Sequence, residues 1–287
     1  MPIAPAARRT MLTLALLAAC GPLAGCSQLR DMLEGTQRPA ASITGVAIDG
    51  LDLDGLTLRF DIRIENPYDV ALPLADIDYT LAGRNLKFLS GKAEMQGTVP
   101  SRGTRTVALP AKVAFKQLME ILKDVRPGAV VPYTAEMGLS VNAPVVGPLR
   151  LPLKHDGQLP IPAPPDVSVT EIKWDAVTLD YARGRVRLAV VNRNSFPVSL
   201  TKFNCALSLG GTDVATCSVA EKTSFAAGGA QDLDIPIGFA PKQAGLAILG
   251  ILTGKGAGYA LKGAVDLATP YGPVSLPVEK AGSTVFK

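Results

Sequence analysis

The chain contains a single histidine, which limits the enzymatic chemistry that it could perform. His155 lies in the sequence Lys154-His155-Asp156-Gly157, which we predict to be a solvent-facing turn after a strand over residues 148–154. A hydrolase triad needs a histidine beside both a nucleophile and a carboxylate, and a zinc site draws on several cysteine and histidine ligands. We therefore predict no catalytic residue, no metal ligand and no cofactor, and we expect that the protein is not an enzyme.

Two groups of aspartates have a spacing that could gather carboxylates. The i, i+2 spacing along a strand places such side chains partly on one face of a sheet. The residues concerned are Asp49, Asp52, Asp54, Asp76 and Asp78. A weak Ca²⁺ site is one interpretation, but the sequence around residues 52–55 lacks the rest of an EF-hand loop. We favour water-exposed carboxylates.

Residues 1–25 have the features of an export signal. Arg8 and Arg9 precede an apolar run over residues 11–19, which is too short to span a bilayer as a helix. The sequence Leu23-Ala24-Gly25-Cys26 resembles the lipobox of bacterial lipoproteins. Leu17-Ala18-Ala19-Cys20 is a second match that leaves a shorter apolar run, so we favour Cys26 over Cys20 as the lipidated residue.

This resemblance implies cleavage before Cys26 and anchorage in a membrane through the acylated cysteine. Each buried CH₂ of an acyl chain contributes about 0.8 kcal/mol to membrane binding, so several chains make a firm anchor. Ser27, rather than an aspartate, follows the cysteine, which implies the outer membrane of a bacterial cell envelope, facing the periplasm. An ordinary cleaved signal with an incidental cysteine is the alternative. Residues 26–42 would then be the lipidated cysteine and a polar tether.

Export also bears on the two remaining cysteines, because disulfides persist in oxidising compartments. Cys205 and Cys217 flank Leu209-Gly210-Gly211-Thr212-Asp213, which is typical of a hairpin turn. If residues 210–212 form a three-residue loop, residue 209 pairs with residue 213, and Cys205 then lies opposite Cys217. We favour a cross-strand disulfide; two reduced core thiols are the alternative.

The elements of the fold are most clearly indicated over residues 56–74. Apolar and polar residues alternate from residue 56 to residue 65, a period of two that predicts a half-buried strand. Asn66-Pro67-Tyr68 then ends the strand, because proline cannot donate to a sheet ladder. A similar pattern returns over residues 186–200, and aligning Asn66 with Asn194 gives an offset of 128 residues. The sequence thus predicts two copies of one domain.

The composition and the many glycines and prolines agree with an all-β chain of two tandem antiparallel β-sandwiches. Of the 287 residues, 47% are apolar and 19% charged, with 28 glycines and 23 prolines, which suits short strands joined by turns. We place the first domain at residues 43–160, a proline-rich linker at 161–166 and the second domain at 167–287. The linker is expected to be an extended, semi-rigid spacer. The net charge of +4 is modest and scattered, so we predict no nucleic-acid partner.

Each domain is predicted to contain one short helix. Apolar residues recur at helical spacing over residues 115–125. The counterpart over residues 244–252 is more apolar than one amphipathic face requires, so it could cover an apolar cavity, contact a bilayer or pack in the core. Its apolar residues are Leu246, Ile248, Leu249, Ile251 and Leu252.

These features together resemble the water-stress and hypersensitive-response domain, also called the type 2 late-embryogenesis-abundant domain. The strand followed by Asn66-Pro67-Tyr68, the short helix and a closing Gly-Pro strand carry the resemblance, over roughly residues 43–160 and 167–285. The second copy departs from the pattern, with Asn194-Ser195-Phe196 and the proline at position 197. We interpret Asn66, Pro67, Tyr68, Asn194 and Phe196 as structural residues. The resemblance implies a fibronectin-III-like antiparallel sandwich.

The resemblance also implies a function: protection of proteins or membranes during water loss or related stress, or maintenance of the envelope. A carrier of lipids or other hydrophobic ligands is a second hypothesis, which a large apolar cavity would favour. A scaffold that binds client proteins through exposed sheet edges is a third.

Overall fold

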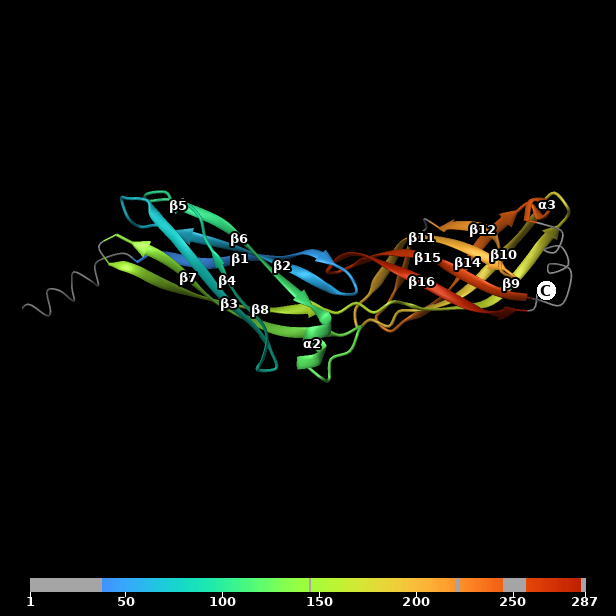
Figure 1. Cartoon of the computed structure of the whole chain (residues 1–287), viewed down its shortest axis with the longest axis horizontal. Helices are drawn as coiled ribbons and strands as arrows, with labels where there is room; N and C mark the ends of the chain where they lie inside the picture. The colour runs from blue at the N-terminus through green and yellow to red at the C-terminus, as the bar shows by residue number, and fades with distance from the viewer. Residues whose placement is uncertain (1–37, 145, 220–221, 245–256, 285–287) are drawn as a thin grey trace, which may run out of the picture. The chain divides into compact units, whose positions relative to one another are not determined.

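The computed structural model describes residues 38–144, 146–219, 222–244 and 257–284. These residues form two tandem antiparallel β-sandwiches, as the sequence predicts (Figure 1). Each sandwich consists of one three-stranded and one larger sheet, and a separate apolar core fills each of them.

The first domain begins with a three-stranded sheet in the order β1-β2-β6, formed by β1 (Ala40–Leu51), β2 (Gly55–Glu65) and β6 (Thr104–Ala114). The opposing sheet has the order β4-β3-β7-β8, formed by β4 (Leu86–Glu94), β3 (Leu72–Gly83), β7 (Val130–Ala143) and β8 (Gly147–Pro160). The short β5 (Thr98–Val99) pairs with β3, and the helix α2 (Phe115–Ile121) follows β6.

The second domain repeats this plan. Its three-stranded sheet has the order β14-β10-β9, formed by β9 (Asp166–Val177), β10 (Ala182–Val191) and β14 (Ala230–Phe239). Its larger sheet has the order β12-β11-β15-β16, formed by β11 (Val198–Leu209), β12 (Thr212–Val219), β15 (Ala257–Thr269) and β16 (Gly272–Thr284). The short β13 (Thr223–Phe225) pairs with β11, and α3 (Pro241–Ala244) follows β14.

Alternation in β2 explains why this strand lies at the centre of the first core. Phe60, Ile62 and Ile64 have no exposed surface. Arg59 and Asp61, on either side of Phe60, point outward and form an ion pair of 2.6 Å. Burying one such apolar side chain contributes about 1.5–3 kcal/mol. The strand is therefore held in register by burial, since a slip of one residue would turn every apolar side chain to solvent.

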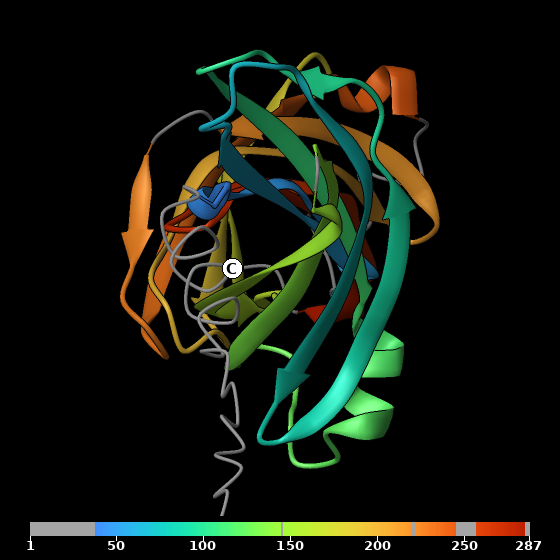
Figure 2. The same ribbon diagram turned by 90° about the vertical axis from the view of Figure 1, so that its left-hand side faces the viewer.

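Helix α2 is shorter than its periodicity predicts. It ends at Ile121, and Leu122 and Val125 are buried from the turn that follows it. The helix lies beside the tip of the β3–β4 hairpin (Figure 2), where a Cβ added at Gly83 would be 3.2 Å from Leu122 Cδ1. The apolar residues that follow Ile121 are thus buried near this hairpin without a longer helix.

The two equivalent hairpins, β3–β4 and β11–β12, have two-residue turns, and this corrects the predicted three-residue loop. Gly210 and Gly211 have φ values of 53° and 84°, and Leu209 pairs with Thr212. A bulge after Leu207 then restores the register, so that Cys205 still pairs with Cys217. Positive φ at both turn positions is the type I′ geometry that tight hairpins favour.

The proline-rich linker is not a solvent-exposed spacer. Ile161 is only 1% exposed and belongs to the first core, and Ala163 is 5% exposed. The backbone of Ile161 donates to Ala129 O at 2.9 Å and accepts from Gly128 N at 2.6 Å, which continues the pairing of β7 and β8 by one residue. The prolines permit this path because their fixed φ suits extended backbone.

Candidate functional site

The Asn66 side chain stabilises the corner where β2 ends, and it is 3% exposed. Its Nδ2 donates to the carbonyl oxygens of Val70, Val99 and Pro100 at 2.8, 3.1 and 2.9 Å. Its Oδ1 accepts from Tyr68 N at 3.0 Å. Both donors and the acceptor of the amide are therefore engaged with backbone groups around the corner, which is the use of asparagine expected at a tight turn.

The neighbouring residues complete this corner. Tyr68 O accepts from Arg102 N at 2.9 Å, and the Arg102 guanidinium pairs with Asp69 at 2.7 Å on the surface. The buried Tyr68 hydroxyl has no hydrogen-bond partner in the part of the chain that the structure describes. Pro67 fits because the backbone has already left the sheet ladder there.

The second domain builds the same corner from Asn192, not from Asn194. Asn192 Nδ2 donates to Phe196 O and Ala226 O, each at 2.9 Å, and its Oδ1 accepts from Asn194 N at 3.0 Å. The backbone bond from Asn192 N to Gly229 O, at 2.8 Å, likewise matches the bond from Asn66 N to Gly103 O, at 2.9 Å. The structural offset between the repeats is therefore 126 residues, and the predicted 128 is wrong.

Asn194 instead binds the linker. Its Oδ1 accepts from Ala163 N at 2.8 Å, and its Nδ2 donates to Ala163 O at 3.2 Å and to Asn192 Oδ1 at 2.9 Å. The position equivalent to Asn194 in the first domain is Tyr68. Phe196 is 4% exposed and packs edge-to-face on Tyr271, with ring centroids 5.3 Å apart. These contacts of Asn194 and Phe196 thus stabilise the fold.

The structure also places the other candidate residues. His155 does not lie in a turn: β8 continues to Pro160, and His155 pairs with Ala135 in the middle of the ladder. Cys205 is disulfide-bonded and lies opposite Cys217. The remaining predicted positions, Cys20, Cys26, Leu246, Ile248, Leu249, Ile251 and Leu252, lie outside the described residues.

The aspartates of the first domain take part in local contacts. Asp52 Oδ1 accepts from the backbone of Asp54 and Gly55, each at 2.8 Å, which closes the turn between β1 and β2. The other three form ion pairs between strands, namely Asp49 with Arg59, Asp76 with Lys92 and Asp78 with Arg150. Among the described residues, no group of three His, Cys, Asp or Glu side chains could hold a metal ion.

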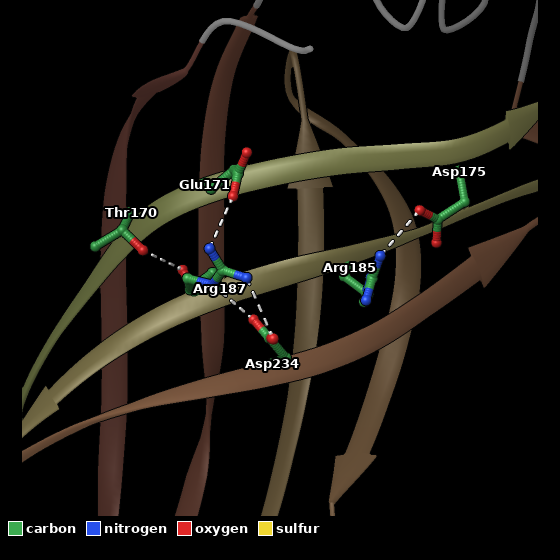
Figure 3. A network of polar contacts seen from close by, with 6 residues as sticks. All are labelled: Thr170, Glu171, Asp175, Arg185, Arg187 and Asp234. Carbon is green, nitrogen blue, oxygen red and sulfur yellow. Dashed lines mark hydrogen bonds and ion pairs between the residues drawn. The ribbon is translucent and has the colours of Figure 1, made fainter.

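The outer face of the β9-β10-β14 sheet carries a network of charges that the sequence analysis did not identify (Figure 3). Arg187 on β10 pairs with Asp234 on β14 at 2.9 Å and with Glu171 on β9 at 3.2 Å. The alternation of apolar and polar residues in these strands would by itself have predicted that these charged side chains share the outer face of the sheet. The hydrogen bond from Arg187 lowers the pKa of the Asp234 carboxyl below its ordinary value.

This network gives a pH-dependent prediction. Because the folded-state pKa of Asp234 is depressed, its contribution to stability is present at neutral pH and is lost as the pH falls below about 4. In Arg187→Gln, NMR titration of the Asp234 carboxyl carbon should show a pKa closer to the ordinary value. Arg183→Gln, outside the network, should leave it unchanged. An unaltered pKa in Arg187→Gln would contradict this assignment.

The described part of the second core contains an apolar cavity, but it is small. It lies between the two sheets beside Val190, Val198 and Phe225, and its volume is about 30 Å³. A single water molecule needs roughly 10–15 Å³ of such space, so the cavity could hold about two waters and has no room for an acyl chain. No helix within the described ranges is both long and apolar enough to cross a membrane.

Comparison with known proteins agrees with this tandem architecture. The sequence model of the late embryogenesis abundant protein family matches residues 61–157 and 187–282, and the starts of the two matches differ by the 126 residues found in the structure. The two matches cover most of the chain. The chain therefore belongs to the late embryogenesis abundant protein family, as a tandem duplicate.

Individual relatives match about one domain's length. A desiccation-related protein of Craterostigma plantagineum is 29% identical over 143 residues, which are 48% of this chain and 91% of the relative. A late embryogenesis abundant protein of Gossypium hirsutum, Lea14-A, is 24% identical over 48% of this chain and 91% of the relative. The solution structure of an Arabidopsis thaliana protein aligns with a TM-score of 0.38 at 23% identity, over 44% of this chain and 84% of that one.

Proposed function

We propose that this chain is a non-enzymatic, lipid-anchored protein of the bacterial envelope that protects neighbouring proteins or membranes during water loss. Family membership in both halves of the chain, with relatives named for desiccation, supports the stress-related role. The lipobox-like sequence ending at Cys26 supports the anchor. The observation that carries the proposal is physical: the apolar cavity in the described part of the second core is only about 30 Å³, so the outer surface is what this protein offers to its surroundings.

That surface is suited to high protein concentration. An edge strand presents unpaired backbone groups that can pair with another chain, and natural proteins block this with proline and lysine. Proline lies within the two longest edge strands of the described sheets: Pro152 in β8, of 14 residues, and Pro277 in β16, of 13 residues. Drying concentrates every protein in the compartment, and a folded protein with blocked edges can separate its neighbours without aggregating itself. The same feature argues against a scaffold that binds partners by strand addition at β8 or β16.

The protective role can be tested by drying. Lactate dehydrogenase dried with this protein and then rehydrated should retain more activity than enzyme dried with an equal mass of serum albumin. Replacing Pro152 and Pro277 with threonine restores two backbone donors at the edges. This variant should protect less and aggregate more on drying. Protection no better than that of albumin would refute the proposed role.

The anchor gives a separate prediction. Cys26→Ser should move the protein from the membrane fraction to the periplasmic extract, because acylation requires the thiol at the cleavage site. Cys20→Ser removes the other candidate thiol and should leave the protein in the membrane fraction. Immunoblots of fractionated cells measure both. The opposite pattern would assign the lipid to Cys20, and retention of both variants in the membrane would exclude a cysteine-linked anchor.

A further inference from the structure

The two sandwiches differ at one place, the opening between the first and last strands of each. In each domain these strands are the edges of opposing sheets, β1 and β8 in the first domain and β9 and β16 in the second. Equivalent positions can be compared directly, because the ladders of the two domains have matching registers. The comparison shows which side chains close each opening.

In the second domain an ion pair joins these two strands, and an indole covers the neighbouring strands of the three-stranded sheet. Asp166 on β9 and Lys280 on β16 lie 3.3 Å apart. The Trp174 ring covers Gly184, where an added Cβ would be 2.9 Å from Trp174 Cε3, and it packs edge-to-face on Phe239 with a centroid separation of 5.7 Å.

The first domain has none of these groups at the equivalent positions. Ala40 replaces Asp166, His155 replaces Lys280 and Ile48 replaces Trp174. Without a carboxylate opposite it, the imidazole of His155 turns to the rings of Phe60 and Tyr133, with centroids 6.3 and 6.4 Å away. At these positions no ion pair therefore joins the two strands of the first domain, and side chains line the opening instead.

The result is a cleft with both apolar and polar lining. Val46, Ile48 and Leu58 form part of its apolar wall, Tyr133 and His155 contribute polar atoms, and Gln158 with Pro270 and Tyr271 of the second domain complete the lining. The Tyr271 hydroxyl lies 3.5 Å from Gln158 Oε1, so these two groups bond to each other. Among the described residues, no hydrogen bond engages the His155 ring nitrogens or the Tyr133 hydroxyl. Burial raises the pKa of Tyr133 to about 12, so its hydroxyl remains a neutral donor at physiological pH.

We propose that this cleft binds a small carboxylate with an apolar body, such as an aromatic acid. The imidazole and the phenolic hydroxyl can each donate a hydrogen bond to the carboxylate, and charge-assisted bonds of this kind are stronger than neutral ones. The aliphatic wall buries the apolar body. A cleft with mainly apolar walls and a few convergent polar groups is the usual form of a small-molecule site. This site is separate from the protective function and does not depend on it.

The test uses the full chain and 2-naphthoate as the probe, followed by amide shifts in ¹H–¹⁵N NMR spectra. Addition of 2-naphthoate should shift the amides of Ile48 and His155 and leave those of Trp174 and Lys280 unchanged. His155→Phe keeps an aromatic ring but has no donor, and it should weaken binding at least tenfold. Lys154→Ala, on the opposite face of β8, should bind as the wild type does.

A second variant tests the cleft itself. Ile48→Trp with Leu58→Gly copies the Trp174–Gly184 pair of the second domain and should fill the opening and abolish the shifts. The spectrum of each variant reports at the same time whether it is folded. Equal affinity of wild type and His155→Phe, or shifts confined to residues outside β1 and β8, would overturn the proposal.

Discussion

Replacing Asn66 with alanine should lower the free energy of unfolding of the first domain by about 3 kcal/mol. The substitution leaves the carbonyl groups of Val70, Val99 and Pro100 without their shared donor, and an unsatisfied buried polar group costs about 1–3 kcal/mol. Water can reach part of the corner and limits the loss. Urea unfolding followed by circular dichroism measures the change.

Two further variants separate hydrogen bonding from packing. Asn66→Asp keeps the shape of the side chain but has no N–H donor, so it should destabilise the domain at least as much as alanine does. Asn192→Ala should cause an equivalent loss in the second domain, where the single tryptophan, Trp174, reports unfolding by fluorescence. Wild-type stability of Asn66→Asp would mean that the amide donors are not what stabilises the corner.

The misplaced repeat register shows what sequence periodicity can and cannot resolve. A shift of two residues along a strand keeps every side chain on the same face, so alignments at 126 and 128 residues have the same pattern of apolar and polar positions. The second copy also contains asparagine at both 192 and 194. The useful signal was the position of asparagine directly after the alternating run, since β10 ends at Val191 as β2 ends at Glu65.

Other differences between prediction and structure arise from tertiary contacts. The strand at 56–65 could be predicted closely because burial on one face gives it clear alternation. The end of β8 could not be predicted, because the polar residues Lys154, Asp156 and Gln158 are typical of a turn. They are the solvent-facing half of a strand whose other half includes Leu159 in the core. The cleft at His155 was missed for this reason.

Reduction of the disulfide at Cys205 is the second large effect that we expect. Cys205 is disulfide-bonded, and a disulfide stabilises a fold mainly by restricting the unfolded chain. A bond to Cys217 would close a loop over residues 205–217 and contribute about 3 kcal/mol. The second domain should therefore unfold at a lower urea concentration in reductant, as followed by Trp174 fluorescence. Cys205→Ala with Cys217→Ala should unfold at the same lower concentration with or without reductant. Non-reducing peptide mapping identifies the bonded partner, which we predict to be Cys217.

In the first domain, the pair of residues equivalent to Cys205 and Cys217 contains no cysteine. At the offset of 126 residues, Cys205 corresponds to Tyr79 and Cys217 to Gly91, and these two residues also pair directly across their strands. The Tyr79 ring covers Gly91 so closely that an added Cβ would lie 2.5 Å from the hydroxyl oxygen. An aromatic ring over a glycine is a known way to pin the register of an edge strand.

Because the two pairs are equivalent, we expect that the Tyr–Gly pair of the first domain can replace the cysteine pair of the second. Cys205→Tyr with Cys217→Gly should recover about 1 kcal/mol of the stability lost in the double alanine variant, the size of a good cross-strand pair. Unlike the wild type, it should be insensitive to reductant. A Tyr–Gly variant no more stable than the double alanine variant would mean that the two domains do not use this position alike. Recovery would show that one register contact in an edge hairpin can be maintained either by a ring or by a covalent bond, the latter being available only to a chain that reaches an oxidising compartment.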